Sequence, residues 1–356
     1  SSYSDWILNR MQDPLLRDSD AFFYDFAGSL NFQPDEKNVF NVLYYQSYDK
    51  FRYSTLSDYE YTNRGGSASW EKHISPALSS KLTGTVSTYQ FANTDQSEVS
   101  RAYTHEYMLN HNELISEFQW IPSLHHKIDF GGSLIYYRLN RGVVEPYGAA
   151  SIRNPTDLGF EQAMEGALFL SDNIEVTKWL SLSAGIRYSF YSMLGPQNVM
   201  LYEEGKPKSE NTIIDSSYFG DFEPVNFHSC TEFRGAINLK SGPQTSFKFS
   251  YNQMRQYLFM LTNTVTISPT DQWKLSDYYI KPQFSQQYTG GIYHIFPKVG
   301  ISTSVEAYYK ESNDIVEYKD GADFITSPLT ETVVLQGSQS AYGVEFMIQK
   351  TTGRLD

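Results

Sequence analysis

The connections between predicted strands in this chain alternate between short and long. Longer, irregular and polar connections lie at 141–160, 195–228, 257–281 and 312–339, with two briefer ones near 54–58 and 93–101. The short connections between them are Gln33–Lys37, Ser75–Leu78, Ile121–His126, Thr177–Trp179, Ser241–Gln244 and Phe296–Gly300. An up-and-down barrel needs this alternation, because its antiparallel strands run between two unlike ends. In outer-membrane barrels the short turns are periplasmic and the long loops lie outside.

The composition fits a barrel whose surface meets lipid. Aromatic residues make up 16% of the 356 residues, with 28 Tyr and 23 Phe, and aromatic rings favour the headgroup level of a membrane. No apolar run approaches the ~20 residues of a spanning helix, so a helical membrane protein is excluded. The mean hydropathy of -0.45 does not exclude a barrel, because only every second strand residue faces lipid.

Charge and cysteine content exclude other classes. The net charge of -13 argues against a nucleic-acid partner, because phosphates must be neutralised by Lys and Arg. A single cysteine, Cys230, excludes an internal disulfide framework and a Cys-based zinc site.

Alternating apolar and polar residues identify about thirteen strands, many longer than the ~5–6 residues of a typical strand. In residues 180–190, Leu180, Leu182 and Ile186 share one face, and Arg187 lies on the other. We therefore predict an all-β fold, a transmembrane antiparallel up-and-down β-barrel. The alternation leaves open which face looks outward: a soluble sandwich turns the apolar face inward, and a membrane barrel turns it toward lipid.

Aromatic residues gather near both ends of the predicted strands. Strands that leave a short turn finish in tyrosines, at Tyr44, Tyr45, Tyr136, Tyr137, Tyr188, Tyr191, Tyr251, Tyr308 and Tyr309. The short-turn end carries Phe32, Trp70, Trp120, Trp179 and Phe296. Two such belts are typical of a barrel in lipid, although aromatic residues are also common in any β-sheet.

Several stretches in the second half of the chain resemble a known family. They are Ser250–Leu258, Ser268–Asp277, Ile280–Gln283, Ser304–Lys310, Glu317–Ala322 and Ala341–Glu345. Their succession resembles the barrel of TonB-dependent outer-membrane receptors. The resemblance is most specific over residues 245–350 and looser, mainly in strand and loop rhythm, over 20–240. It implies a barrel of the 22-stranded type with a plugged lumen.

The resemblance also implies a function. Such receptors actively import a scarce nutrient across the bacterial outer membrane and bind it with extracellular loops and the plug. The implied partners are TonB with its inner-membrane energising complex, a small-molecule or oligomeric nutrient, membrane lipid and a surface lipoprotein. No cofactor is expected. Iron chelates, cobalamin and glycans all remain open as ligands.

We expect the chain to be the middle portion of a larger barrel. Thirteen strands would leave two unpaired strand edges, and unpaired backbone groups are too costly in the hydrocarbon core of a membrane. Residues 1–19 resemble an outer-loop segment without a signal peptide, and residues 20–350 hold the strands. Residues 351–356 resemble a turn that awaits another strand. The plug and the TonB box are not found in this sequence.

The loop at 257–281 supplies the candidate ligand contacts. Pro269 fixes the start of a turn, and Asp271 can hydrogen-bond the backbone two residues further on. A tryptophan beside them could stack on a sugar or another ring, or pack against the barrel rim. Residues 254–261 favour one or two helical turns. The residues predicted to bind ligand are Arg255, Tyr257, Asp271, Trp273 and Lys274.

Catalytic and metal chemistry find little support in the sequence. His105, His111 and Glu113 share a strand face, but without further ligands at suitable spacing no metal site is predicted. Arg187 and Glu306 are expected to form ion pairs inside the barrel. No nucleophile elbow or phosphate loop is present, so we predict no enzyme, and a barrel-borne hydrolase finds no support.

Two further interpretations remain open. The acidic loop 195–228 could attract cationic or metal-linked ligands, or could be solvated surface. The alternative to an importer is a soluble all-β cell-surface carbohydrate-binding module, with Leu180, Leu182 and Ile186 in its core.

Overall fold

The computed structural model describes residues 2–3, 8, 10–54, 56–262, 271–322 and 327–350 of the chain. Within this part, one antiparallel sheet contains thirteen long strands. They are β2 (Asp20–Asp35), β3 (Asn38–Tyr53), β4 (Ser57–Ser75), β5 (Leu78–Asp95), β6 (Tyr103–Ser123), β7 (His126–Asn140), β10 (Phe160–Thr177), β11 (Leu180–Leu194), β14 (His228–Ser241), β15 (Thr245–Gln256), β18 (Gln283–Phe296), β19 (Ile301–Tyr318) and β20 (Val334–Lys350).

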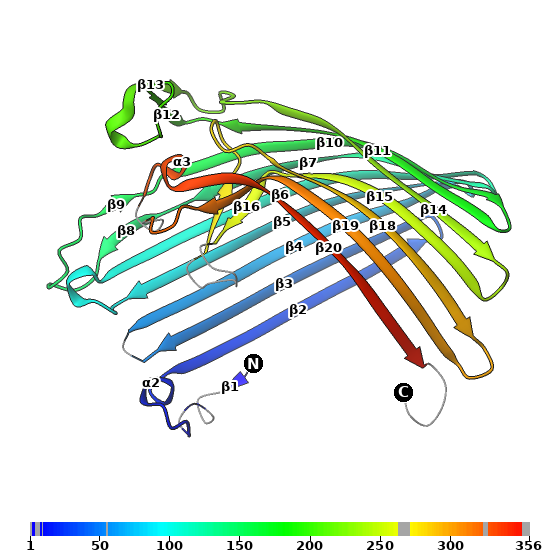
Figure 1. Cartoon of the computed structure of the whole chain (residues 1–356), viewed down its shortest axis with the longest axis horizontal. Coiled ribbons are helices and arrows are strands. Elements are labelled where there is room, and N and C mark those ends of the chain that lie inside the picture. The colour runs from blue at the N-terminus through cyan, green and yellow to red at the C-terminus, as the bar shows by residue number, and fades with distance from the viewer. Residues whose placement is uncertain are drawn as a thin grey trace.

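The long strands pair in the order in which they follow along the chain, as an up-and-down sheet requires. The alternation of short and long connections is confirmed, since all six predicted short turns lie at one end. Residues 36–37 link β2 to β3, for example, and 178–179 link β10 to β11. Figure 1 shows these turns on the right and the long loops on the left.

Smaller elements lie within the N-terminal segment and the long connections. The β12–β13 and β16–β17 pairs each form a separate two-stranded sheet. Within the described chain, no helix is both long and apolar enough to span a membrane. The smaller elements are β1 (Ser2–Tyr3), α2 (Pro14–Arg17), η1 (Val99–Arg101), β8 (Val143–Pro146), β9 (Thr156–Asp157), β12 (Gln197–Tyr202), η2 (Glu210–Thr212), β13 (Ile213–Phe219), β16 (Leu258–Leu261), β17 (Gln272–Leu275) and α3 (Thr330–Val333).

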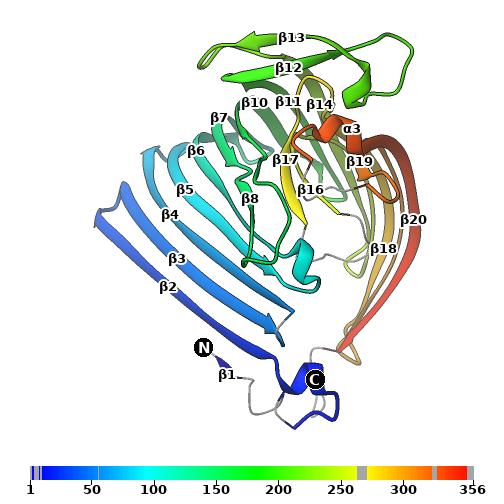
Figure 2. The ribbon, with the colours of Figure 1, turned by 90° about the vertical axis from the view of Figure 1, so that its left-hand side faces the viewer.

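The sheet curves into an open trough. Figure 2 shows β2 and β20 at its two sides, and the β16–β17 hairpin inside the curve. Among the described residues, β2 pairs with β3 and the two-residue β1, and β20 pairs only with β19. The sheet is therefore open between β2 and β20, with the β16–β17 hairpin on its concave side, and its convex side is the outer surface.

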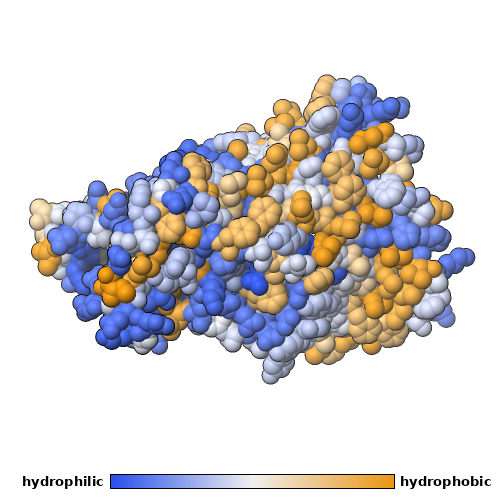
Figure 3. Space-filling model, turned by 90° about the horizontal axis from the view of Figure 1, so that it is seen from above, coloured by the Kyte–Doolittle hydropathy of each residue, from blue (hydrophilic) through white to orange (hydrophobic). Residues whose placement is uncertain are grey.

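The apolar face of the strands is exposed on the outer surface. Leu168 is 63% exposed, Ile186 42% and Ile237 43%. Figure 3 shows apolar side chains gathered over the half toward the short turns and polar ones prevailing toward the long loops. Such an outward apolar face is typical of a barrel that meets lipid. The soluble module with Leu180, Leu182 and Ile186 in its core is therefore wrong.

Aromatic side chains form rows on this outer face. Tyr251, Tyr288, Tyr309 and Tyr342 are successive register partners across β15, β18, β19 and β20. Near the short turns, Phe40 on β3 and Trp70 on β4 stack with ring centroids 6.1 Å apart. These rows support the predicted belts, because amphipathic rings prefer the membrane interface.

Two local predictions are wrong. The final loop, predicted at 312–339, spans only 319–333, because β19 continues to Tyr318 and β20 begins at Val334. A bulge at Asp314, whose φ is 57°, shifts the register and disturbs the alternation that the sequence displays. The predicted helical turns at 254–261 are instead strand, since the segment continues β15 and then pairs as β16 with β17. Residues 263–270, with Pro269, and 351–356 lie outside the described residues.

Candidate functional site

The β16–β17 hairpin folds back into the mouth of the barrel at the long-loop end. Tyr257, just before β16, stacks on Tyr191 of β11 with ring centroids 4.7 Å apart and planes 1° from parallel. Both rings are buried. The Tyr191 hydroxyl donates to the Ser276 carbonyl at 2.6 Å, and the Tyr107 hydroxyl donates to the Asp271 carbonyl at 3.0 Å. The inner face of the barrel thus holds the hairpin in place through aromatic residues.

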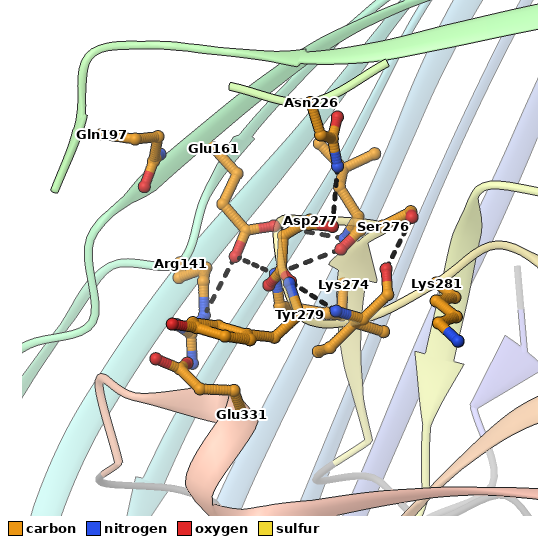
Figure 4. Close-up of polar contacts among 12 residues, drawn as sticks. Arg141, Glu161, Gln197, Asn226, Lys274, Ser276, Asp277, Tyr279, Lys281 and Glu331 are labelled. Atoms are coloured by element: carbon orange, nitrogen blue, oxygen red, sulfur yellow. Dashed lines mark hydrogen bonds and ion pairs between the residues drawn. The ribbon is translucent and has the colours of Figure 1, made fainter. Parts of the chain in front are cut away.

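A buried ion-pair cluster fixes the end of the hairpin (Figure 4). The ammonium of Lys274 lies 2.9 Å from Glu161 Oε1 and 2.6 Å from Asp277 Oδ2. The side chains of Lys274 and Glu161 are only 3% and 6% exposed. Glu161 Oε2 also accepts the backbone N–H of Leu275 at 3.2 Å. A buried charge needs such partners, so each member of the cluster holds the others in position.

The carboxylates around Lys274 affect its pKa more strongly than its burial does. Burial acts to lower the pKa of Lys274, but the carboxylates of Asp277 and Glu161 favour the ammonium form and raise the pKa above its ordinary value. Asp277 is fixed in turn, because its Oδ1 accepts the backbone N–H groups of Tyr279 at 2.8 Å and Ile280 at 2.7 Å. Lys274 is therefore a charged anchor rather than a free cation.

A second cation, Arg141, extends the cluster toward the last long loop. Arg141 Nε lies 4.0 Å from Glu161 Oε1. Its Nη1 and Nη2 donate to the carbonyls of Pro328 at 3.1 Å and Ser327 at 3.2 Å. Three parts of the chain that are distant in the sequence therefore meet at one point: the 141–159 loop with the start of β10, then β17, and the segment before α3.

A polar pocket of about 230 Å³ opens beside this cluster. Arg141, Glu161, Lys274 and Asp277 form part of its wall, together with side chains from β12, the 278–279 turn and α3. Its chemistry comprises paired charges of both signs, amide groups and phenol rings. It can bind polar or charged ligand groups through hydrogen bonds and stacking. The lining also includes Asn198, Tyr278, Tyr279 and Glu331.

Glu331 on α3 and the β12–β13 hairpin complete the pocket. The Tyr202 hydroxyl donates to Glu331 Oε1 at 2.8 Å. Burial raises the pKa of the Glu331 carboxyl above its ordinary range. Tyr279 donates from its hydroxyl to the Met200 carbonyl at 2.6 Å, and Lys208 Nζ lies 4.7 Å from the centroid of its ring. The acidic loop 195–228 thus provides a wall of the pocket.

The structure separates the five residues predicted to bind ligand. Lys274 lines the pocket, whereas Tyr257 and Asp271 are buried where the hairpin meets the barrel. Trp273 lies in β17, with its ring edge-on to Tyr89 at 6.4 Å. Arg255 lies apart, on the outward face of β15, with its Cζ 5.0 Å from the Phe284 ring centroid. A ligand role for these residues stays a prediction.

Sequence reasoning missed most of the pocket. Arg141 and Glu161 flank the long loop that separates β7 from β10. Their position beside a long loop is the only feature of the sequence that could have indicated them. Lys274 was predicted without Glu161, because nothing in a single sequence pairs β17 with β10. Its other partner, Asp277, lies three residues further along the same loop and was not predicted. The lining residues that were missed are Arg141, Glu161, Asn198, Asp277, Tyr278, Tyr279 and Glu331.

The other candidates form structural contacts within the barrel. His105 Nε2 makes a 2.7 Å hydrogen bond with the Arg141 carbonyl, and His111 Nε2 lies 3.5 Å from Glu113 Oε2. Among the residues that the structure describes, no group of three His, Cys, Asp or Glu could hold a metal ion. Arg187 donates to Ser133 Oγ at 3.4 Å across the inner face.

The meander, the outward apolar face and the two unlike ends define an outer-membrane β-barrel. The family model described as "TonB dependent receptor-like, beta-barrel" matches residues 3–354. The chain therefore belongs to the TonB-dependent receptor β-barrel family, and it is an outer-membrane protein. A search of curated protein sequences gives no match.

Solved structures of receptors share this fold at low sequence identity. The ferric-catecholate import receptor Fiu from E. coli has a TM-score of 0.62 at 12% identity, over 94% of this chain and 56% of its own. The Serratia marcescens hemophore receptor HasR, solved with its hemophore and heme, has a TM-score of 0.66 at 11% identity, over 92% and 52%. The ferripyoverdine receptor of Pseudomonas aeruginosa has a TM-score of 0.64 at 12% identity, over 94% and 48%. The chain thus spans about half the length of these structures.

Proposed function

We propose that this chain serves TonB-dependent import of a nutrient, as the barrel portion of a receptor that binds its ligand at the long-loop end. The observation that carries the proposal is the β16–β17 hairpin, which Lys274 and Glu161 fix in the barrel mouth at 2.9 Å beside a polar pocket. A fixed interior loop presents side chains to an arriving ligand at little entropic cost. Import by such a barrel depends on binding contacts rather than covalent chemistry.

We infer that the ligand is a metal-bearing nutrient that the pocket only partly encloses. The similar structures are named for ferric catecholate, heme and ferripyoverdine. The pocket volume of about 230 Å³ is below the ~300–1,000 Å³ of a site that encloses a small molecule. It therefore suits a protruding polar group of a larger ligand, such as a hydroxyl or carboxylate at the edge of a chelate.

Within the pocket, we assign binding to the exposed phenol and positioning to the buried cluster. Tyr278 is 49% exposed and lines the pocket, so its ring is available for stacking on a ligand. Lys274 and Asp277 satisfy each other at 2.6 Å and hold the 278–279 turn in position. We assign Tyr257 and Asp271, which were predicted to contact the ligand, to the positioning of the hairpin as well, because both are buried where it meets the barrel.

The test is a binding assay on the full-length receptor with ferric catecholate, heme, cobalamin and a glycan mixture. We expect one of the iron-containing ligands to bind, and Tyr278→Ala to weaken that binding about tenfold, the equivalent of one lost aromatic contact. Tyr218→Ala is the matched control, because this tyrosine is 72% exposed on β13 and does not line the pocket. Uptake in cells should stop when TonB is deleted. Binding of none of the panel, or uptake without TonB, would contradict the proposal.

A further inference from the structure

A polar row crosses the outward face of the barrel between β3 and β10. Its members are successive register partners: Gln46, Arg64, Thr88, Asn110, Arg138 and Gln162. They share the outward face with Val86, which is 59% exposed two residues before Thr88, and with Leu134, which is 42% exposed four residues before Arg138. From Gln46 to Arg138 the row therefore faces away from the barrel interior. Gln162 at its end is buried, and its amide donates to the Gly195 carbonyl and, at 3.3 Å, to Asp221 Oδ1 in the 195–228 loop.

The surface is hollowed between the two arginines of this row. The hollow has a volume of about 550 Å³, and Arg64 and Arg138 lie among its lining residues. Small residues make the depression, since Gly65, Gly66 and Ser87 form part of its wall. Thr88, Asn110 and Asn112 add polar groups to the wall. The Thr88 hydroxyl donates to Asn110 Oδ1 at 2.8 Å, so these polar groups are held in place.

The hollow is basic in an otherwise acidic chain. The chain carries 41 Asp and Glu against 28 Lys and Arg, yet no acidic residue lines this hollow. Within the described part of the chain, neither Arg64 nor Arg138 has a carboxylate within the 4.0 Å of an ion pair. Both side chains are exposed, and Arg138 lies with its Cζ 5.0 Å from the Phe160 ring centroid. Their guanidinium groups are available to an external anion.

The position of the row relates the hollow to the membrane. Toward the short turns, the same face becomes apolar, with Leu114 52% exposed on β6 and Leu134 on β7. Toward the long loops, it becomes charged, with the Lys50–Glu60 ion pair on β3 and β4. The arginines thus lie where the apolar band ends on the loop side, which in an outer-membrane barrel is the headgroup level of the outer leaflet.

We propose that this hollow binds the phosphate-bearing headgroup of an outer-leaflet lipid. Planar guanidinium groups bind phosphate oxygens through paired, charge-assisted hydrogen bonds. The lipid's acyl chains would then cover the adjacent apolar side chains of Val86, Leu114 and Leu134. The occupant is a lipid rather than the imported nutrient, because the hollow opens on the convex surface. The proposal therefore stands independently of the ligand that the receptor imports.

The test uses the full-length receptor in detergent, with diphosphoryl lipid A as the probe and its phosphate-free form as the comparison. Bound lipid is counted by native mass spectrometry. We expect the diphosphoryl form to bind and the phosphate-free form to bind at least about tenfold more weakly, since charge-assisted hydrogen bonds are lost. The R64Q/R138Q variant should show the same loss. Millimolar inorganic phosphate should not displace the lipid, because free phosphate lacks the acyl contacts.

Lys72→Gln is the matched control. Lys72 lies on the same strand and the same outward face as Arg64, but at the short-turn end, so its replacement should leave lipid binding unchanged. Equal binding of the two lipid forms to the wild-type receptor would overturn the proposal without any variant. Wild-type binding by a folded R64Q/R138Q receptor would overturn it too. Complete displacement by inorganic phosphate would show a phosphate site and not a lipid site.

Discussion

Lys274 on β17 and Glu161 on β10 meet at 2.9 Å inside the barrel mouth, where both side chains are almost fully buried. The pair joins a loop hairpin to a barrel strand that is distant in the sequence. Asp277 adds a second carboxylate at 2.6 Å, and Arg141 lies 4.0 Å from Glu161 on the other side. Two cations and two anions therefore compensate one another, which makes the cluster sensitive to the loss of any single member.

Replacing Lys274 by methionine should release the hairpin. The change leaves Glu161 and Asp277 buried without their shared cation, which costs about 3–5 kcal/mol for a broken buried pair. Hydrogen exchange should therefore accelerate in residues 271–281, while exchange in the long strands stays slow. The matched control is Lys206→Met, which removes an ion pair with Glu203 of 2.8 Å whose side chains are 56% and 48% exposed. That exposed pair contributes only ~0–1 kcal/mol. Unchanged exchange in 271–281 of the Lys274 variant would show that the aromatic contacts suffice.

The same cluster should loosen at alkaline pH. The pKa of Lys274 is raised above 10.5, because the Asp277 and Glu161 carboxylates outweigh the effect of burial. A raised folded-state pKa contributes stability that is fully present below the unfolded value and is lost as the pH rises through the folded value. Exchange in residues 271–281 should thus rise only above pH 10.5, after correction for the intrinsic rate. A Lys274→Met variant should lack this step, and a step in both proteins would assign it to another group.

The segment around α3 should become more stable on mild acidification. Burial raises the pKa of the Glu331 carboxyl above 4.5, and the nearby Asp277 charge acts in the same direction. The ionised form is therefore penalised in the folded state, and the penalty disappears as the pH falls through the raised pKa toward the unfolded value. Exchange protection of residues 327–335 should increase as the pH is lowered from 7 toward 4.5.

Replacing Glu331 by glutamine removes the charge of the side chain and keeps its shape. Glu331→Gln should be more protected than the wild type at pH 7 and should lose the pH dependence, because its amide stays neutral. Glu204→Gln, an exposed residue of the β12–β13 hairpin, should keep the wild-type pH profile. The interpretation fails if the Glu331 variant still gains protection on acidification.

The long strands could be predicted from the sequence, whereas the site could not. Strict alternation such as that around Ile186 identifies a strand from neighbouring residues alone, and the short turns order the strands. At Asp314 a positive φ and a bulge interrupt that pattern, so β19 seemed to end early. The contact between Lys274 and Glu161 depends on how a loop folds back into the barrel. The sequence around Lys274 and the sequence around Glu161 do not indicate that the two side chains pair.

A charged side chain on the outward face of the strands should destabilise the barrel only where lipid covers that face. Leu168 is 63% exposed in the middle of β10 and lies on the apolar outer face. Leu168→Arg should destabilise the folded barrel by about 2–4 kcal/mol, the cost of an arginine at the bilayer midplane. The measurement is the urea dependence of folding into lipid vesicles, which reports the insertion free energy. Ile214→Arg is the matched control, because Ile214 is 67% exposed on the β12–β13 hairpin at the long-loop end. Its substitution should stay within ~0.5 kcal/mol of the wild type. Equal effects at both positions would mean that the face around Leu168 meets water rather than lipid.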